Sequence, residues 1–487
     1  MPRPPRPLIP SLLLCFAAVA GSAAGGAPST GPLGPAVEER LDALVDTKLA
    51  YRVISSTPVP VVPSPALPSG LGLQPTNNNL SIALHEGRLF LAFRTAPTHF
   101  ASTEAKLLVL SSPDLGRTWT FETSFATGRD LREPFLLVVA GRLHLYFVEL
   151  GSRFYTFEPQ SLWRSSRYGA GCWTAPERWG GPEEVAWDFK VRRGRAWMTS
   201  YLGKHYELRS HPIEVYFRSS TDGVAWKDVG DGPVYRGGVT EASFEFDAGG
   251  ALWAITRNED GDATGFGSHV ATADAAEPGD WRFPDRSNPL RFDSPRLFRH
   301  GKDIYLLARR DLGPPAGTRF TALTGDLRKL FVWVGYSLEA KRTALYRLDP
   351  ASRRFELVFD LPSAGDTAFP SVARLSPHEF LVANYSSAFR HADRSWFRGQ
   401  VNATGIYFVR LRFEPLGQDG IPAASVGGPS VASTSGTPLA APSGGFDEDW
   451  PIQESHSSRR RLAGVGVLSV GALVLVRRRR RRLAAAR

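Results

Sequence analysis

Six pairs of polar residues recur at similar positions along the chain, and their chemistry suits an anionic or polyhydroxylated ligand. In each pair, one residue lies several positions before a Gly- or Pro-containing turn, and the other lies several positions after it. The pairs are Asn79 with Arg94, Glu133 with Glu149, Asp188 with Tyr201, Glu241 with Arg257, Ser294 with Arg309, and Asp366 with Tyr385. An arginine binds a carboxylate through a planar fork, and a ring of three can enclose one such group.

A second interpretation of the same residues is purely structural. Arginine–carboxylate pairs also satisfy the polar end of a central channel without binding any ligand. Both interpretations require a fold that brings the six pairs to one place.

The turns between the paired residues reveal that fold. They lie at Gly87, Gly141, Gly194, Gly250, Gly301 and Pro377, at spacings of 54, 53, 56, 51 and 76 residues, and a β-rich run follows each. A period near fifty with several strands per unit is typical of a β-propeller. The 47 glycines and 38 prolines also argue against a helical bundle. We therefore predict an all-β fold, a six-bladed β-propeller with four-stranded antiparallel blades, over residues 76–415.

Propeller geometry brings the pairs together. The innermost strand of a blade runs into the turn and the second strand runs back, so the two members of a pair share one face near the axis. On this basis the predicted substrate-binding residues share one mouth; they are Arg94, Arg257, Arg309, Glu133, Asp188 and Asp366.

A second motif follows some of these turns. Its full copy is Ser112–Trp119, and a shorter copy is Ser220–Trp226. The Asp of each copy is expected to cap backbone N–H groups of a hairpin turn, while the Trp packs beneath that turn between blades. Asp114 and Asp222 are therefore predicted to be structural and to lie on the face opposite the mouth.

The repeats, these Asp-box motifs and the segment 240–258, which contains Glu241 and Arg257, resemble the sialidase (neuraminidase) superfamily. The resemblance covers about 340 of the 487 residues. It implies an arginine triad that grips the carboxylate of sialic acid, a Tyr nucleophile activated by a Glu, and an Asp acid/base. By this resemblance Glu241 is the catalytic glutamate and Arg94, Arg257 and Arg309 form the triad.

The sequence departs from this pattern at the nucleophile. Phe369 stands where the resemblance implies a Tyr, and Tyr385 is the candidate replacement. The loop after Arg94 lacks an obvious Asp, although it contains His99. Two hypotheses follow: an exo-glycosidase that hydrolyses terminal anionic sugars, or a catalytically inactive propeller that binds glycan or protein. Neither requires a cofactor, and the scattered histidines indicate no metal site.

The two ends of the chain have other compositions. Residues 1–26 are typical of a signal peptide, 27–75 form an N-terminal extension, and 416–458 form a linker rich in Gly, Ser and Pro. Residues 459–487 combine a short apolar run with ten arginines, which account for the net charge of +10. The nearly neutral remainder argues against nucleic-acid binding. We expect an exported protein at the outer face of the cell envelope, tethered to a membrane by this tail or secreted after its removal.

Overall fold

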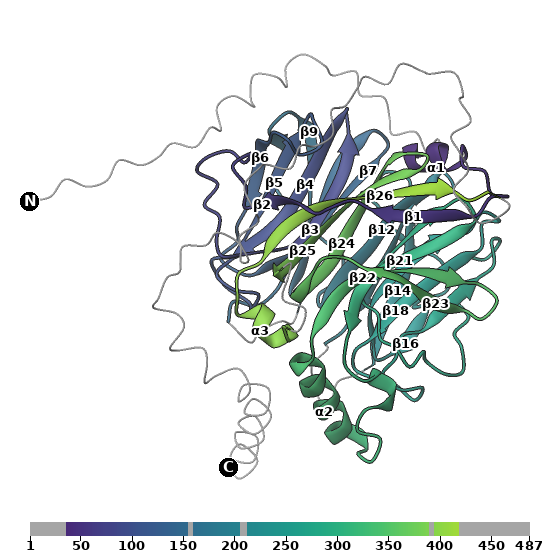
Figure 1. The fold of residues 1–487 in the computed structure, drawn as a ribbon. Coiled ribbons are helices and arrows are strands. Elements are labelled where there is room, and N and C mark those ends of the chain that lie inside the picture. The colour runs from purple at the N-terminus through teal and green to yellow at the C-terminus, as the bar shows by residue number, and fades with distance from the viewer. Residues whose placement is uncertain (1–35, 154–158, 205–211, 389–393, 418–487) are drawn as a thin grey trace, which may run out of the picture.

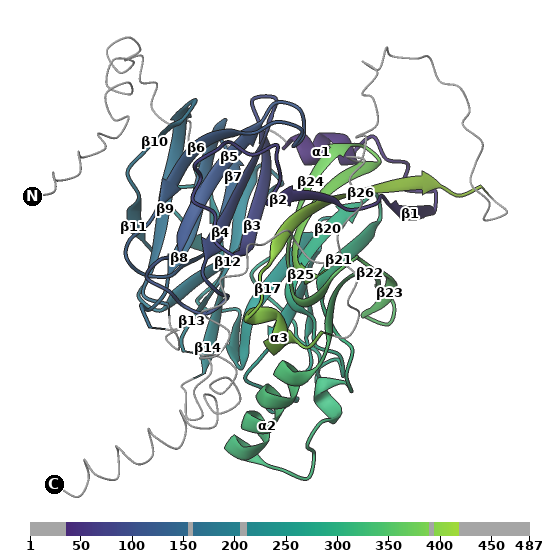
Figure 2. The same ribbon diagram turned by 60° about the vertical axis from the view of Figure 1, so that its left-hand side comes forward.

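Six antiparallel sheets surround a common axis, as expected for a six-bladed propeller (Figure 1, Figure 2). The structure is a computed structural model, and it describes residues 36–153, 159–204, 212–388 and 394–417. The innermost strand of each sheet contacts the innermost strands of both neighbours, in the ring order β3, β7, β12, β17, β20, β24 and back to β3. The predicted propeller is therefore confirmed.

The first three blades lie between residues 76 and 237. Blade 1 comprises β3 (Thr76–His85), β4 (Arg88–Ala96), β5 (Lys106–Ser112) and β6 (Thr120–Phe125). Blade 2 comprises β7 (Leu131–Val139), β8 (Arg142–Glu149), β9 (Ser161–Gly169), β10 (Cys172–Trp173) and β11 (Glu177–Trp179). Blade 3 comprises β12 (Glu184–Arg192), β13 (Arg195–Leu202), β14 (Ile213–Ser220), β15 (Lys227–Asp228) and β16 (Tyr235–Gly237).

The other three blades complete the ring. Blade 4 comprises β17 (Val239–Phe246), β18 (Leu252–Asn258) and β19 (Val270–Ala273), with an isolated bridge between Thr272 and Arg282 at its outer edge. Blade 5 comprises β20 (Asp293–His300), β21 (Asp303–Asp311), β22 (Lys341–Asp349) and β23 (Arg354–Asp360). Blade 6 comprises β24 (Ala364–Ser376), β25 (Glu379–Ala388), β26 (Gly405–Pro415), β1 (Tyr51–Ser55) and β2 (Val59–Val62).

The N-terminal extension closes the ring. Strands β1 and β2 pair antiparallel with β26, so the two ends of the propeller are joined by backbone hydrogen bonds. The propeller thus begins at Tyr51 and includes part of the segment predicted as an extension. Pairing the first strands with the last removes an open sheet edge and holds blade 6 against blade 1.

The predicted turns lie where expected. Between β3 and β4, Glu86 and Gly87 both have positive φ (49° and 71°), and Ala140 and Gly141 repeat this between β7 and β8 (48° and 75°). Two consecutive positive φ angles are typical of a type I′ hairpin turn, which matches the twist of its strands.

The Asp boxes are confirmed as structural turns. Asp114 accepts hydrogen bonds from the backbone N–H and the hydroxyl of Thr118 (2.8 and 2.7 Å) in the turn between β5 and β6. Trp119 of the same turn lies edge-on to Phe408 of blade 6, with 6.2 Å between the rings. Each box therefore caps its own hairpin and packs against the preceding blade.

Four short helices decorate the two faces. They are α1 (Val37–Asp42), the 3-10 helix η2 (Ala316–Thr318), α2 (Gly325–Leu338) and α3 (Trp396–Gln400). In Figures 1 and 2, α2 and α3 lie at one end of the strands and α1 lies at the other. Within the described ranges, no helix has the length and hydrophobicity needed to cross a bilayer. The predicted signal peptide and apolar tail lie outside the described residues.

The first prediction concerns the Asp box. Although burial opposes it, hydrogen bonds from Thr118 and Ser112 hold the pKa of Asp114 below its ordinary value. We expect Asp114→Ala to lower the free energy of unfolding by about 1–2 kcal/mol at pH 7, as for other lost caps. A depressed folded pKa stabilises above the unfolded pKa, so the difference from wild type should disappear as the pH falls below about 4.

Urea unfolding of both proteins between pH 3 and 7 measures this difference. Asp231→Ala serves as the control, because Asp231 is exposed and makes no hydrogen bond to another described residue. Equal effects of the two substitutions would contradict the capping role.

Candidate functional site

A β-bulge interrupts every innermost strand near the same end of the propeller. The breaks in strand register fall at Asn79, Glu133, Trp187, Glu241, Ser294–Pro295 and Phe369–Pro370. The first four of these follow one another at intervals of 54 residues. A bulge re-aims a side chain out of the regular pleat, so these residues form a ring at the mouth of the channel.

Several contacts close this ring. The amide of Asn79 donates to Glu133 Oε2 (3.1 Å), and the backbone N–H of Ser294 donates to Glu241 Oε2 (2.7 Å). The rings of Trp187 and Phe369 lie 5.3 Å apart across the channel from those polar pairs' own blades. The mouth thus combines two carboxyl groups with an aromatic wall.

The two carboxyl groups differ in their partners. Burial, together with the charge of Glu241, raises the pKa of Glu133 to about 8. Burial also raises the pKa of Glu241, but Arg257 opposes this shift by donating to Oε1 at 2.6 Å. Glu133 is therefore protonated at neutral pH, whereas Glu241 accepts two hydrogen bonds as a carboxylate does.

Arg257 lies among three carboxylates. Its guanidinium contacts Glu241 (2.6 Å), Glu259 (2.5 Å) and Asp293 (2.8 Å), and its side chain is only 7% exposed. Three negative charges around one cation leave no excess positive charge for an anionic ligand. Arg257 lies at the mouth as predicted, but its environment favours a structural role.

Arg94 is also committed to protein partners. It is fully buried, and its N–H groups donate to Asp130, Asn78 and the carbonyl oxygens of Thr98 and Phe100. These bonds use all five donors of a guanidinium. A ligand carboxylate would have to displace them.

Arg309 has a different environment. Its Nε donates to the carbonyl oxygen of Thr367 (2.9 Å), and its Nη1 lies 3.5 Å from the hydroxyl of Tyr336. Its guanidinium lies 5.0 Å from the ring of Trp396, and no ion pair involves it among the described residues. Of the three predicted arginines, Arg309 is the one whose charge a carboxylate does not already neutralise.

Tyr385 and Asp366 belong to a buried hydrogen-bond network behind the ring. The Tyr385 hydroxyl donates to Asp366 Oδ1 (3.0 Å), and His99 Nδ1 lies 2.7 Å from Asp366 Oδ2. Burial raises the pKa of Asp366, but His99, Arg309 and Tyr385 outweigh it and hold that pKa below its ordinary value. Burial and Asp366 raise the pKa of Tyr385 well above its ordinary value. Tyr385 is thus a neutral phenol bound to a carboxylate other than Glu241, which does not favour its predicted role as nucleophile.

Phe369 separates Tyr385 from the mouth. Its ring lies 6.3 Å from the ring of Tyr385 and contacts Trp187 on its other side. The nearest phenol therefore lies behind the position where the resemblance implies a nucleophile.

Asp188 does not face the ring. It is fully buried and contacts Lys190 (3.0 Å), Ser243 (2.5 Å) and Arg296. The predicted pairing of Asp188 with Tyr201 is wrong, because Asp188 lies opposite Thr199 and Tyr201 lies opposite Val185. The pairing of Glu133 with Glu149 is likewise wrong, because Glu149 lies opposite Leu131. Counting outward from the turns misses the extra residue in each bulge.

The sequence analysis missed several residues at the mouth. Trp187 occupies the position on blade 3 that was given to Asp188, and the 54-residue interval was the signal that identifies it. Tyr336 on α2 and Trp396 on α3 come from the long connections of blades 5 and 6, and their rings are 5.2 Å apart. The only hint of these two was the lengthened 76-residue spacing. No cluster of metal-ligating side chains occurs in the part of the chain that the structure describes.

The second prediction separates Arg257 from Arg309. We expect Arg257→Gln to lower the free energy of unfolding by about 3–5 kcal/mol at pH 7, because it leaves buried carboxylates unpaired. Arg309→Gln should cost much less, about 1 kcal/mol, because it removes no ion pair. The loss in Arg257→Gln should shrink toward pH 5, as Glu241 becomes protonated. Urea unfolding at both pH values measures this, and equal losses would contradict the assignment.

No protein-family model matches the sequence, and no curated protein matches it. Solved structures do match. A protein of unknown function from Dyadobacter fermentans is similar at 15% identity and a TM-score of 0.51, covering 74% of this chain and 99% of that one. The phage phi92 endosialidase is similar at 11% identity and a TM-score of 0.47, with coverages of 80% and 76%. The Trypanosoma rangeli sialidase is similar at 13% identity and a TM-score of 0.45, with coverages of 69% and 54%. At such identities the similarity concerns the fold alone, and at that level it agrees with the predicted sialidase-like propeller.

Proposed function

We propose that this propeller is a carbohydrate-active protein that binds a sugar at its mouth and hydrolyses the glycosidic bond. The observation that carries the proposal is the pairing of a protonated Glu133 with a carboxylate, Glu241, on bulges of two blades of one ring. Glycoside hydrolysis generally uses two carboxyl groups, of which one donates a proton to the leaving oxygen. Glu133 has the raised pKa that a general acid needs at neutral pH.

The surrounding side chains suit a sugar ring. Trp187 and Phe369 supply an apolar face, and sugar rings carry C–H groups that pack on such faces. Arg309, whose charge is not neutralised by a carboxylate, is the donor for an acidic group of the sugar. The proposed ligand is therefore a terminal anionic sugar, such as a sialic or a uronic acid.

Binding without hydrolysis is the second candidate function. Phe369 favours it, because a phenyl ring has no oxygen to attack an anomeric carbon, and the Tyr385 hydroxyl behind it is bound to Asp366. A hydrolase with this mouth would use water as the nucleophile, activated by Glu241, instead of a tyrosine.

The third prediction tests the roles of the two glutamates. The full-length protein is incubated with chromogenic sialosides, uronides and neutral glycosides. We expect Glu133→Gln and Glu241→Gln each to lower kcat by about 10²–10⁴-fold while the protein stays folded. Glu379→Gln is the control, since Glu379 lies on β25 and pairs with Arg410 outside the mouth.

The pH profile gives an independent readout. The acid form of Glu133 is the active one, so kcat/KM should fall as the pH rises through about 8. If no glycoside is cleaved but an anionic sugar binds and Arg309→Ala abolishes that binding, the second candidate function holds. If Phe369→Tyr then gains sialidase activity, the mouth also retains the geometry that a tyrosine nucleophile needs. Neither cleavage nor binding of any sugar would contradict both functions.

The fourth prediction concerns localisation, which the ends of the chain suggest. We propose that residues 1–26 direct export and that 462–476, flanked by arginines, tether the propeller to a membrane. Deleting 459–487 should move the mature protein from the membrane fraction to the soluble fraction without changing its melting temperature. A full-length mature chain that is already soluble and keeps its tail would contradict the tether.

A further inference from the structure

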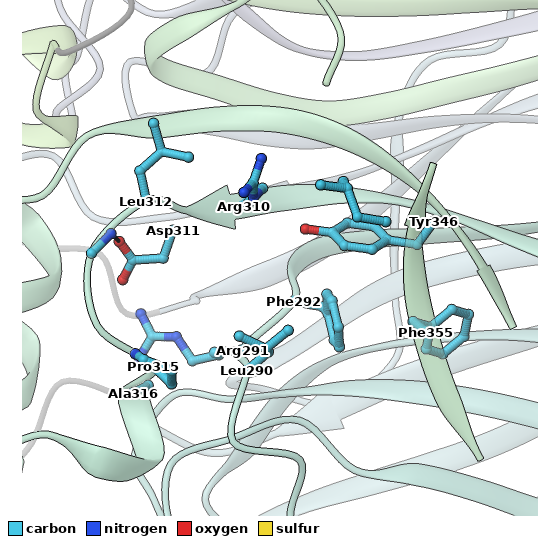
Figure 3. Close-up of a pocket in the computed structure, with 12 residues that line it drawn as sticks. Leu290, Arg291, Phe292, Arg310, Asp311, Leu312, Pro315, Ala316, Tyr346 and Phe355 are labelled. Atoms are coloured by element: carbon cyan, nitrogen blue, oxygen red, sulfur yellow. Dashed lines mark hydrogen bonds between the residues drawn. The ribbon is translucent and has the colours of Figure 1, made fainter. Parts of the chain in front are cut away.

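A pocket of about 270 Å³ lies in blade 5, outside the ring at the mouth. Its walls come from the segment that precedes β20, the end of β21, and the strands β22 and β23 (Figure 3). By volume it holds about nine water molecules, which corresponds to a small organic ligand rather than a single ion.

One end of the pocket is apolar. The ring of Phe292 lies 5.0 Å from that of Tyr346 and 5.8 Å from that of Phe355. Leu357 completes this end and is 45% exposed, so it lies at the rim. Aromatic walls of this kind bind the apolar body of a ligand.

The other end contains a buried arginine with an unused donor. Arg291 is 4% exposed, and its Nε donates to Asp293 Oδ2 (3.1 Å). Its Nη1 has no hydrogen-bond partner among the described residues. A buried N–H without a partner costs free energy, which a ligand oxygen would recover.

The charge of Arg291 is only partly compensated. Asp293, its one carboxylate partner, also pairs with Arg257 at 2.8 Å, so a single negative charge serves two guanidinium groups. Asp311, which also lines this end, is itself neutralised by Lys341 (2.9 Å) and Arg319 (3.0 Å). The polar end therefore keeps excess positive charge and favours an anion.

Tyr346 supplies a second polar group. Figure 3 shows its hydroxyl directed toward the polar end, on the side of Arg310. This hydroxyl makes no hydrogen bond to any other residue that the structure describes. A ligand that reaches Arg291 across the aromatic rings would pass beside it.

We propose that this pocket is a second binding site, for a small organic monoanion with an apolar body. The carboxylate of the ligand accepts from Arg291 Nη1, and its apolar body lies against Phe292, Tyr346 and Phe355. The site is separate from the mouth and does not depend on sugar hydrolysis.

The fifth prediction uses phenylacetate as the probe, because it has one carboxylate, one ring and about ten non-hydrogen atoms, for which a Kd of about 1 mM or tighter is reasonable. Phenylacetamide, which has the same shape without the charge, is the matched ligand control. Saturation-transfer NMR and calorimetry with the full-length protein should show saturable binding of phenylacetate and at least about tenfold weaker binding of phenylacetamide.

Two pairs of variants locate the site. Arg291→Gln should weaken phenylacetate binding by about tenfold or more. Because Arg291 also contacts Asp293 and the ring of Tyr336, a second variant is needed that does not disturb the core. Leu357→Glu places a negative charge at the exposed rim and should abolish binding, whereas Val358→Glu, at a neighbouring position that is 39% exposed and does not line the pocket, should not.

Three outcomes would overturn the proposal. They are the absence of saturable phenylacetate binding up to about 10 mM, equal binding of acid and amide, and equal effects of Leu357→Glu and Val358→Glu. Loss of binding in Leu357→Glu alone, with an unchanged melting temperature, supports it.

Discussion

The bulge near the start of each innermost strand is the constraint on which the mouth depends. Four of the bulges contain a residue with positive φ that is not glycine: Asn79 (42°), Glu133 (50°), Ser294 (50°) and Phe369 (54°). This backbone conformation costs about 1–2 kcal/mol for an L-residue, so the flanking hydrogen-bonded ladders must hold it in place. Its consequence is geometric. Side chains that a regular strand would place alternately on its two faces are instead directed at the axis.

The charges around the mouth follow from the same crowding. Five buried cations lie there with five buried carboxylates, and most of these groups have partners of opposite sign; they are Arg94, Arg132, Arg257, Arg291 and Arg309 with Asp130, Glu241, Glu259, Asp293 and Asp366. Buried ions are tolerated only when paired and hydrogen-bonded. This pairing leaves a protonated Glu133 and a carboxylate-free Arg309 as the groups with capacity for a ligand.

The sequence predicted those features that local patterns determine. The type I′ turns and the Asp boxes depend on residues close together in the chain, and the structure confirms both. The residues at the mouth were only partly predictable. Glu133, Glu241 and Arg309 lie where the blade geometry placed them, but Asp188 does not, because the bulge at Trp187 shifts the register by one residue. The closing strand β1 and the ring of Tyr336 come from segments without the repeat pattern. The neutralising partners of Arg257 include Asp293 of the next blade, and a single sequence gives no signal for such contacts.

The protonation of Glu133 is the central claim, and a carboxyl titration tests it most directly. The full-length protein, labelled with ¹³C at the glutamate carboxyl carbons, is followed by NMR from pH 4 to 10, and Glu133→Gln assigns the resonance. The account predicts that the resonance missing in the variant titrates near pH 8. If that resonance titrates between about pH 4 and 5, as in an unperturbed glutamate, Glu133 is ionised at neutral pH and the assignment of an acid at the mouth is wrong.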